Sequence, residues 1–207
     1  MTDQVLHAQH TAHDDHGHSH HHDPASKVIF GFWVFILTDC ILFAAEFATY
    51  SVLHNNTYGN IGITGTAPLS WVLAQTLLLL VSCFTYGLSL RSMHRNSRPQ
   101  MQFWLLVTFI LGLLFVVREF NQFAYLLDTG HSWHDSAFLS AFFSLMGTHF
   151  FHMCVGLIWI VILIIQFALQ NITPMMKTRL ICLGLFWNFL NLVWVCIFTL
   201  VYLMGAI

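Results

Sequence analysis

The chain has 207 residues, of which 57% are hydrophobic and only 8% are charged, whereas about a quarter of the residues in an average soluble protein are charged. Seven Lys and Arg and nine Asp and Glu are too few to cover the surface of a soluble domain of this size. The net charge of −2 excludes a nucleic-acid-binding protein, and the hydrophobicity excludes a disordered chain. The composition therefore predicts an integral membrane protein.

Residues 1–27 form a polar, His-rich segment that we expect to be a disordered cytoplasmic tail. It holds four of the nine acidic residues and eight of the fourteen histidines. These histidines could bind a transition metal weakly or form an inert solvated tail, and their interrupted pattern favours the second interpretation. They are His7, His10, His13, His16, His18, His20, His21 and His22.

Five long apolar runs follow the tail. A helix needs about 20 apolar residues to cross the hydrocarbon core of a bilayer. Residues 28–207 are therefore predicted to form an all-α bundle of five transmembrane helices. We expect Pro68 and Pro99 to mark helix starts and Pro174 to lie in a connection. The runs cover about 28–53, 68–90, 101–127, 137–169 and 180–207.

The basic residues between the runs predict the orientation in the membrane. Outside the runs, Lys and Arg occur only before the first run and in the second and fourth connections. Residues 54–67 and 128–136 contain none, and neither do the last residues of the chain. By the positive-inside rule, the N-terminus lies in the cytoplasm and the C-terminus in the periplasm. The six basic residues are Lys27, Arg91, Arg95, Arg98, Lys177 and Arg179.

Several polar side chains lie inside the apolar runs, where an ionisable group costs roughly 2.5–3.5 kcal/mol on insertion scales and needs a partner. Asp39 and Glu46 lie seven residues apart in the first run, which places them on one helix face. The third run contains Arg118 and Glu119. Three-residue spacings in the last two runs place each pair on neighbouring parts of a face. These pairs are His149 with His152 and Asn188 with Asn191.

The depths of two charged residues suggest an ion pair. At a rise of 1.5 Å per residue, Glu46 lies about 10 Å from the outer end of its run and Arg118 about 13 Å from the outer end of its own. Their similar heights lead to the hypothesis of a Glu46–Arg118 ion pair between the first and third helices.

These polar groups have a functional and a structural interpretation. They could form a proton path, an ion site or a metal site, or they could only supply hydrogen bonds between helices. Two histidines are too few for a closed metal site, which favours the structural interpretation for His149 and His152. For Asp39 both interpretations stay open. A stripe of small residues in the fourth run is interpreted as a helix-packing face and as a candidate contact with a partner. It comprises Ala137, Ser140, Ala141, Ser144 and Gly147.

Three motifs together resemble a known family. Residues 30–43, FGFWVFILTDCILF, are similar to the first common helix of subunit III of the haem-copper respiratory oxidases. Residues 147–156, GTHFFHMCVG, match its pattern G-x-H-x-x-H-x-x-x-G, and residues 186–194, FWNFLNLVW, resemble its segment F/Y-W-H-F-x-D-x-x-W. The resemblance runs from about residue 28 to the C-terminus. Five spans, the His-rich leader and the ending VYLMGAI are most similar to the quinol-oxidase branch of cytochrome bo type.

The resemblance implies a non-catalytic subunit III of a proton-pumping terminal ubiquinol oxidase in the inner membrane of a bacterium. Such a subunit supports subunit I, which holds the haems and copper, and has no cofactor of its own. The implied partners are subunits I, II and IV and membrane lipids, with ubiquinol as substrate of the complex. Asp39 falls where the family has its buried carboxylate, for which the resemblance suggests a role in sustained turnover or proton supply.

Departures from the family pattern favour packing over proton transfer. Asn188 and Asn191 stand where the family commonly has His and Asp, so two titratable groups are replaced by hydrogen-bonding amides. Gln122 stands near a position where an acid is usual. The alternative from a different class is a stand-alone transporter of protons or metal ions. That alternative would need a site near the midplane and broken helices, for which the runs give no Gly/Pro signal.

Overall fold

A computed structural model describes residues 24–54, 68–95, 97–130, 136–169 and 173–203. All elements in these ranges are helical, and five helical segments are long and apolar enough to cross a membrane, which confirms the predicted fold class. The helices are α1 (Pro24–Leu53), α3 (Leu69–His94), α4 (Arg98–Asp128), α5 (Ala137–Leu169) and α6 (Pro174–Ile197), and α6 continues into a π-helical turn, η1 (Phe198–Leu203).

The helix ends follow local chemistry. Pro174 is the first residue of α6 and does not lie in a connection as predicted, because its missing N–H is no loss in a first turn. Thr173 caps this helix by accepting a hydrogen bond from the Met176 N–H at 3.3 Å. Gly130, with φ of +80°, follows α4 in the left-handed conformation that commonly ends helices. The predicted tail lies outside the described residues as far as residue 23, and α1 already begins at Pro24.

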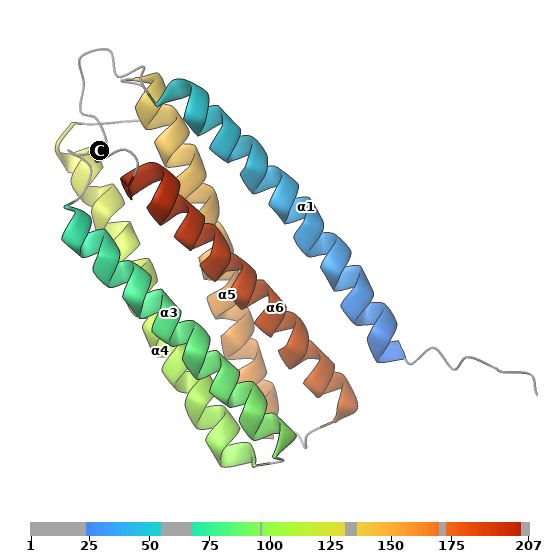
Figure 1. The fold of residues 1–207 in the computed structure, drawn as a ribbon. Coiled ribbons are helices and arrows are strands. Elements are labelled where there is room, and N and C mark those ends of the chain that lie inside the picture. Colours follow the sequence, from blue (N-terminus) through green and yellow to red (C-terminus); the bar gives the residue numbers. More distant parts are fainter. Residues whose placement is uncertain (1–23, 55–67, 96, 131–135, 170–172, 204–207) are drawn as a thin grey trace, which may run out of the picture.

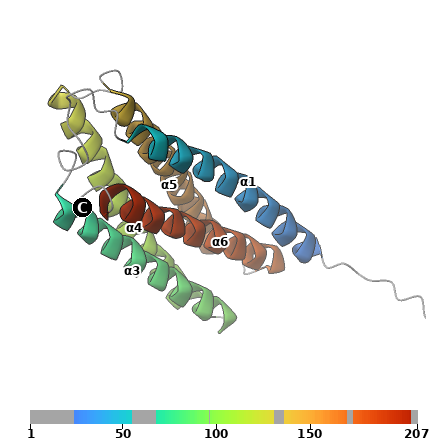
Figure 2. The same ribbon diagram turned by 45° about the horizontal axis from the view of Figure 1, so that its top comes forward.

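The helices pack as a bundle with α6 inside and α1 at one edge (Figure 1). Helix α1 contacts α5 and α6, whereas α3 and α4 form an antiparallel pair on the other side of α6 (Figure 2). In the most apolar stretch of the segment Pro174–Leu203, 67% of the residues are buried, against 17% in α1. The last segment is therefore the centre of the bundle, and α1 is its most lipid-exposed member.

Trp187 of α6 lies at this centre. Its ring packs against Gly112 of α4 and Gly156 of α5, where an added Cβ would come within 2.7 Å and 3.1 Å of ring atoms. Its indole N–H donates to the Ser82 hydroxyl of α3 at 3.1 Å. One side chain thus joins four helices. A Cβ at Gly112 would force the ring to shift, and a Cβ at Gly156 would fit only tightly beside it.

Candidate functional site

Two carboxylate–histidine pairs lie inside the bundle, and α5 supplies the histidine of each. His152 faces α1, with its Nε2 3.8 Å from Asp39 Oδ1. His149 faces the interior, with its Nδ1 3.8 Å from Glu119 Oε1 of α4. The histidines keep the close spacing predicted from the sequence, but α5 lies between two different neighbours, so each histidine meets its own acid.

The hydrogen bond of His152 determines which ring nitrogen faces Asp39. Its Nδ1 lies 2.7 Å from the Thr148 carbonyl oxygen. A carbonyl can only accept, so Nδ1 carries a hydrogen and Nε2 is the nitrogen that faces Asp39. The distance of 3.8 Å from Nε2 to Oδ1 is longer than a hydrogen bond, so the two groups form an ion pair only when the imidazole is protonated and the carboxylate is ionised.

The second pair has the same arrangement in a more enclosed place. His149 Nε2 lies 3.4 Å from the Leu190 carbonyl oxygen of α6, so Nδ1 is the nitrogen that faces Glu119. The two side chains are 0% and 1% exposed, against 14% and 10% for His152 and Asp39. The His149 ring also packs against Phe115 and Trp194, at centroid distances of 5.8 Å and 5.2 Å. The Glu119–His149 pair is therefore part of the bundle core.

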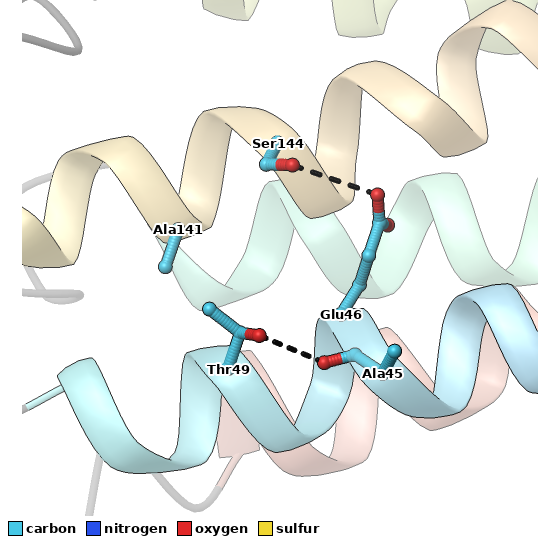
Figure 3. Close-up of a pocket in the computed structure, with 5 residues that line it drawn as sticks. All are labelled: Ala45, Glu46, Thr49, Ala141 and Ser144. Atoms are coloured by element: carbon cyan, nitrogen blue, oxygen red, sulfur yellow. Dashed lines mark hydrogen bonds between the residues drawn. The ribbon is translucent and has the colours of Figure 1, made fainter.

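Glu46 lies on the same face of α1 as Asp39, as the seven-residue spacing predicted. Its Oε1 accepts a hydrogen bond from Thr148 at 2.7 Å and a longer one from Ser144 at 3.5 Å, both on α5. Beside it is a pocket of about 130 Å³ lined by Ala45, Glu46, Thr49, Ala141 and Ser144 (Figure 3). The small residues of α5 thus make room for α1 at this place.

The hypothesis of a Glu46–Arg118 ion pair is wrong. Arg118 is exposed on α4, and its guanidinium carbon lies 5.8 Å from the ring centroid of Trp71 in the first turn of α3. Helix α1 packs on α5 and α6, whereas Arg118 lies with the α3–α4 pair. The depth argument failed because equal height along two helices does not make them neighbours.

The predicted asparagines have separate surroundings. Asn188 is exposed, and its Oδ1 accepts a hydrogen bond from the Cys83 thiol of α3 at 2.6 Å. Asn191 is buried and donates to the Trp187 carbonyl oxygen at 3.1 Å. Gln122 donates to the Tyr202 hydroxyl at 2.9 Å. Asn188 and Gln122 therefore bond to neighbouring elements, whereas Asn191 bonds within α6, and its buried Oδ1 has no hydrogen-bond partner among the described residues.

Sequence reasoning missed the hydroxyl groups that bind the buried tryptophans. The Trp194 indole N–H donates to the Thr76 hydroxyl of α3 at 3.0 Å, in the same way as Trp187 donates to Ser82. The sequence did indicate that these groups need partners, because both hydroxyls and both indoles lie within apolar runs. The pairing itself depends on which helix is the neighbour, which no spacing within one helix reveals.

Within the described ranges, no group of three or more His, Cys, Asp or Glu side chains is placed to hold a metal ion. The histidines of the predicted tail, His7 to His22, lie outside these ranges. The described part of the chain thus offers two acid–histidine contacts inside the bundle, each at 3.8 Å.

The fold and these pairs define a polytopic helical membrane protein with ionisable pairs inside its bundle. The family model of cytochrome c oxidase subunit III matches residues 5–206, and the chain belongs to that family. It is 46% identical over 192 residues to the cytochrome bo(3) ubiquinol oxidase subunit 3 of Pseudomonas aeruginosa, covering 93% of this chain and 92% of the relative.

Two further relatives agree with this assignment. The protein of the same name from Pseudomonas putida is 43% identical over the full length of both chains. The quinol oxidase subunit 3 of Bacillus spizizenii is 37% identical over 93% of this chain and 97% of its own. The resemblance inferred from the motifs is confirmed, and the family favours a subunit of a multi-subunit respiratory oxidase over a stand-alone transporter.

Proposed function

We propose that this chain is the non-catalytic subunit III of a proton-pumping terminal ubiquinol oxidase of cytochrome bo type. The observation that carries the proposal is the identity to relatives named ubiquinol oxidase subunit 3, which extends over nearly the whole of both chains. In this proposal subunit I contains the haems and copper, and subunits I, II and IV are the partners. Ubiquinol is the substrate of the complex and not a ligand of this chain.

The proposed location is the inner membrane of a bacterium, with the N-terminus in the cytoplasm. In the structure, the basic side chains cluster at one end of the bundle, where α3 ends and α4 begins and where α6 begins. Arg91 and His94 lie in the last turn of α3, and Lys177 lies in the first turns of α6. Under the positive-inside rule this end faces the cytoplasm, and the C-terminus faces the periplasm.

For the polar residues we propose a division of roles. Glu119 with His149, and Asn191, stabilise the interior of the bundle. Asp39 and His152 form a proton-holding pair at the interface between α1 and α5. Of the two described pairs this one is the more exposed, since its side chains are 10% and 14% exposed, against 1% and 0% for Glu119 and His149. That exposure would let the pair exchange its proton during turnover, whereas the enclosed pair would exchange only when the bundle opens.

Purification tests the proposed function directly. The chain should be isolated through an affinity tag in a mild detergent, and a visible spectrum and ubiquinol oxidation should be measured on the eluate. Haem absorbance and ubiquinol-oxidising activity are the expected results. A colourless, monodisperse five-helix protein without partner subunits would contradict the proposal.

Prolonged assays test the role of Asp39. In an assembled complex, Asp39→Asn keeps the shape of the side chain but removes its titrating group. We expect normal initial rates and a faster decline of activity over many turnovers. Glu46→Gln is the matched control on the same face of α1, and it should behave like the unchanged protein. An equally stable activity in Asp39→Asn would show that the pair is only structural.

A further inference from the structure

Glu119 and His149 are buried in the core, yet their polar atoms are not fully hydrogen-bonded. Among the described residues, both carboxyl oxygens of Glu119 and the Nδ1 of His149 have no hydrogen-bond partner. The 3.8 Å between Nδ1 and Oε1 is longer than a hydrogen bond, so the two groups do not satisfy each other. Buried polar side-chain atoms nearly always have a partner, either in the protein or in ordered water. These three atoms therefore need a further hydrogen-bonding group.

The position of the pair limits what that group can be. Both side chains are at most 1% exposed. Glu119 also lies one turn deeper in α4 than Gln122, whose amide donates to the Tyr202 hydroxyl of η1 at 2.9 Å. A side chain of another subunit cannot approach groups that are enclosed to this extent. The observations therefore favour a small molecule held between the helices.

Tyr202 brings a third polar group to the same place. It is buried, and it lies close enough to Glu119 to interact with its charge. Its oxygen accepts the hydrogen bond from Gln122, whereas the hydrogen of its own O–H group has no acceptor among the described residues. A donor thus lies near the carboxyl group and the imidazole nitrogen that need partners.

We propose that Glu119, His149 and Tyr202 enclose a binding site for a resident water molecule. Two atoms 3.8 Å apart can both lie within hydrogen-bond distance of one water oxygen, placed beside the line that joins them. The water accepts a hydrogen bond from the Tyr202 hydroxyl and donates one each to His149 Nδ1 and to the Glu119 carboxylate. Three such partners are typical of a buried water molecule.

The water connects the acid to the histidine for proton transfer, which 3.8 Å does not allow directly. When Glu119 is protonated, its hydrogen passes to the water while a hydrogen of the water passes to His149 Nδ1. The carboxyl O–H bond and one water O–H bond break, while one water O–H bond and one N–H bond form. The water is regenerated, and the neutral pair becomes an ion pair. The reverse transfer restores the neutral pair, and the proton stays inside the bundle.

This site goes beyond the proposed function, in which Glu119 and His149 only stabilise the bundle. It does not depend on that function, because every group that forms the site belongs to this chain. The proton transfer is also separate from the Asp39–His152 pair, which lies at the interface between α1 and α5.

Radiolytic labelling of the purified complex tests for the enclosed water. A short X-ray pulse converts water into hydroxyl radicals, which hydroxylate the side chains beside them, and mass spectrometry locates the products. Tyr202 is the reporter. Tyr86 is the matched control, because it is as deeply buried and its hydroxyl donates directly to the Leu180 carbonyl oxygen at 2.6 Å. We expect several-fold more labelling of Tyr202 than of Tyr86, and equal labelling of the two would overturn the proposal.

Two further measurements separate an enclosed water from radicals that enter from outside. Tyr50 of α1 lies near Tyr202 and is more exposed, at 6% against 2%, so radicals from outside would label it at least as strongly. We expect it to be labelled less than Tyr202. In the double variant Glu119→Leu, His149→Leu, which removes two of the three partners of the water, labelling of Tyr202 should fall to the level of Tyr86. Labelling of Tyr50 that equals or exceeds that of Tyr202, or unchanged labelling of Tyr202 in the double variant, would contradict the site.

Discussion

The two carboxylate–histidine pairs show how the same chemistry acquires different roles in different parts of one bundle. Both place an imidazole nitrogen 3.8 Å from a carboxylate oxygen, and both use a backbone carbonyl to orient the ring. Glu119–His149 lies among α4, α5 and α6, while Asp39–His152 lies at the edge helix α1. When one member of a pair enclosed by packed helices is lost, the remaining ionisable group has no other partner. At the interface of an edge helix, the remaining group can instead bind a lipid headgroup, water or a partner subunit.

Breaking the enclosed pair should have the largest effect. In His149→Leu, Glu119 loses its partner in the core, and removal of one member of a buried pair costs about 3–5 kcal/mol. We expect the chain to be lost from purified complexes. The double variant Glu119→Leu, His149→Leu removes both groups and should assemble better than either single variant. The measurement is the stoichiometry of this chain in the complex, and equal damage in all three variants would contradict an energetic pairing.

Substitution of the glycines around Trp187 tests whether the centre of the bundle is as tightly packed as the difference between the two acid–histidine pairs assumes. In Gly112→Ala the new Cβ would lie 2.7 Å from the Trp187 ring, and overpacking of this kind costs about 1–3 kcal/mol. A lower unfolding temperature of the complex is expected. Gly87→Ala is the matched control, because no atom lies within 4 Å of its added Cβ. Equal stability of the two variants would show that the centre tolerates added volume.

Breaking the seam pair should cost less. Asp39→Asn keeps a polar side chain opposite His152, and interhelical polar contacts in membrane proteins contribute about 1 kcal/mol. We expect the complex to assemble and its unfolding temperature to fall only slightly. The decisive measurement is a direct comparison with His149→Leu in one thermal-unfolding experiment. If both variants lose the same stability, burial does not distinguish the two pairs.

The smallest effect is expected at Asn188, which lies on an exposed surface of α6. Asn188→Ala removes its bond to the Cys83 thiol, a contribution of roughly 0.6 kcal/mol for an average interhelical contact. Assembly should be mildly disturbed, while the number of protons pumped per electron should stay the same. Proton-pumping measurements on reconstituted vesicles check this, and a reduced stoichiometry in a fully assembled complex would give Asn188 a role in proton transfer.

The sequence was sufficient for features that depend on one helix at a time. Hydrophobic length alone determines that five segments can cross a membrane, because each must bury its own backbone hydrogen bonds. Helical periodicity correctly placed Asp39 and Glu46 on one face of α1. The order of the motifs identified the family, since they retain the chemistry and the spacing of its helices.

Only the tertiary structure decided which helices meet. The rise per residue gave Glu46 and Arg118 similar heights, yet α1 packs on α5 and α6, so Glu46 binds Thr148 while Arg118 lies against Trp71. In the same way, the spacing of His149 and His152 did not reveal that they serve different acids. Height is a property of one helix, whereas the choice of neighbour depends on the packing of all five. At Trp187 that packing uses glycines on two other helices, which leave space for the ring.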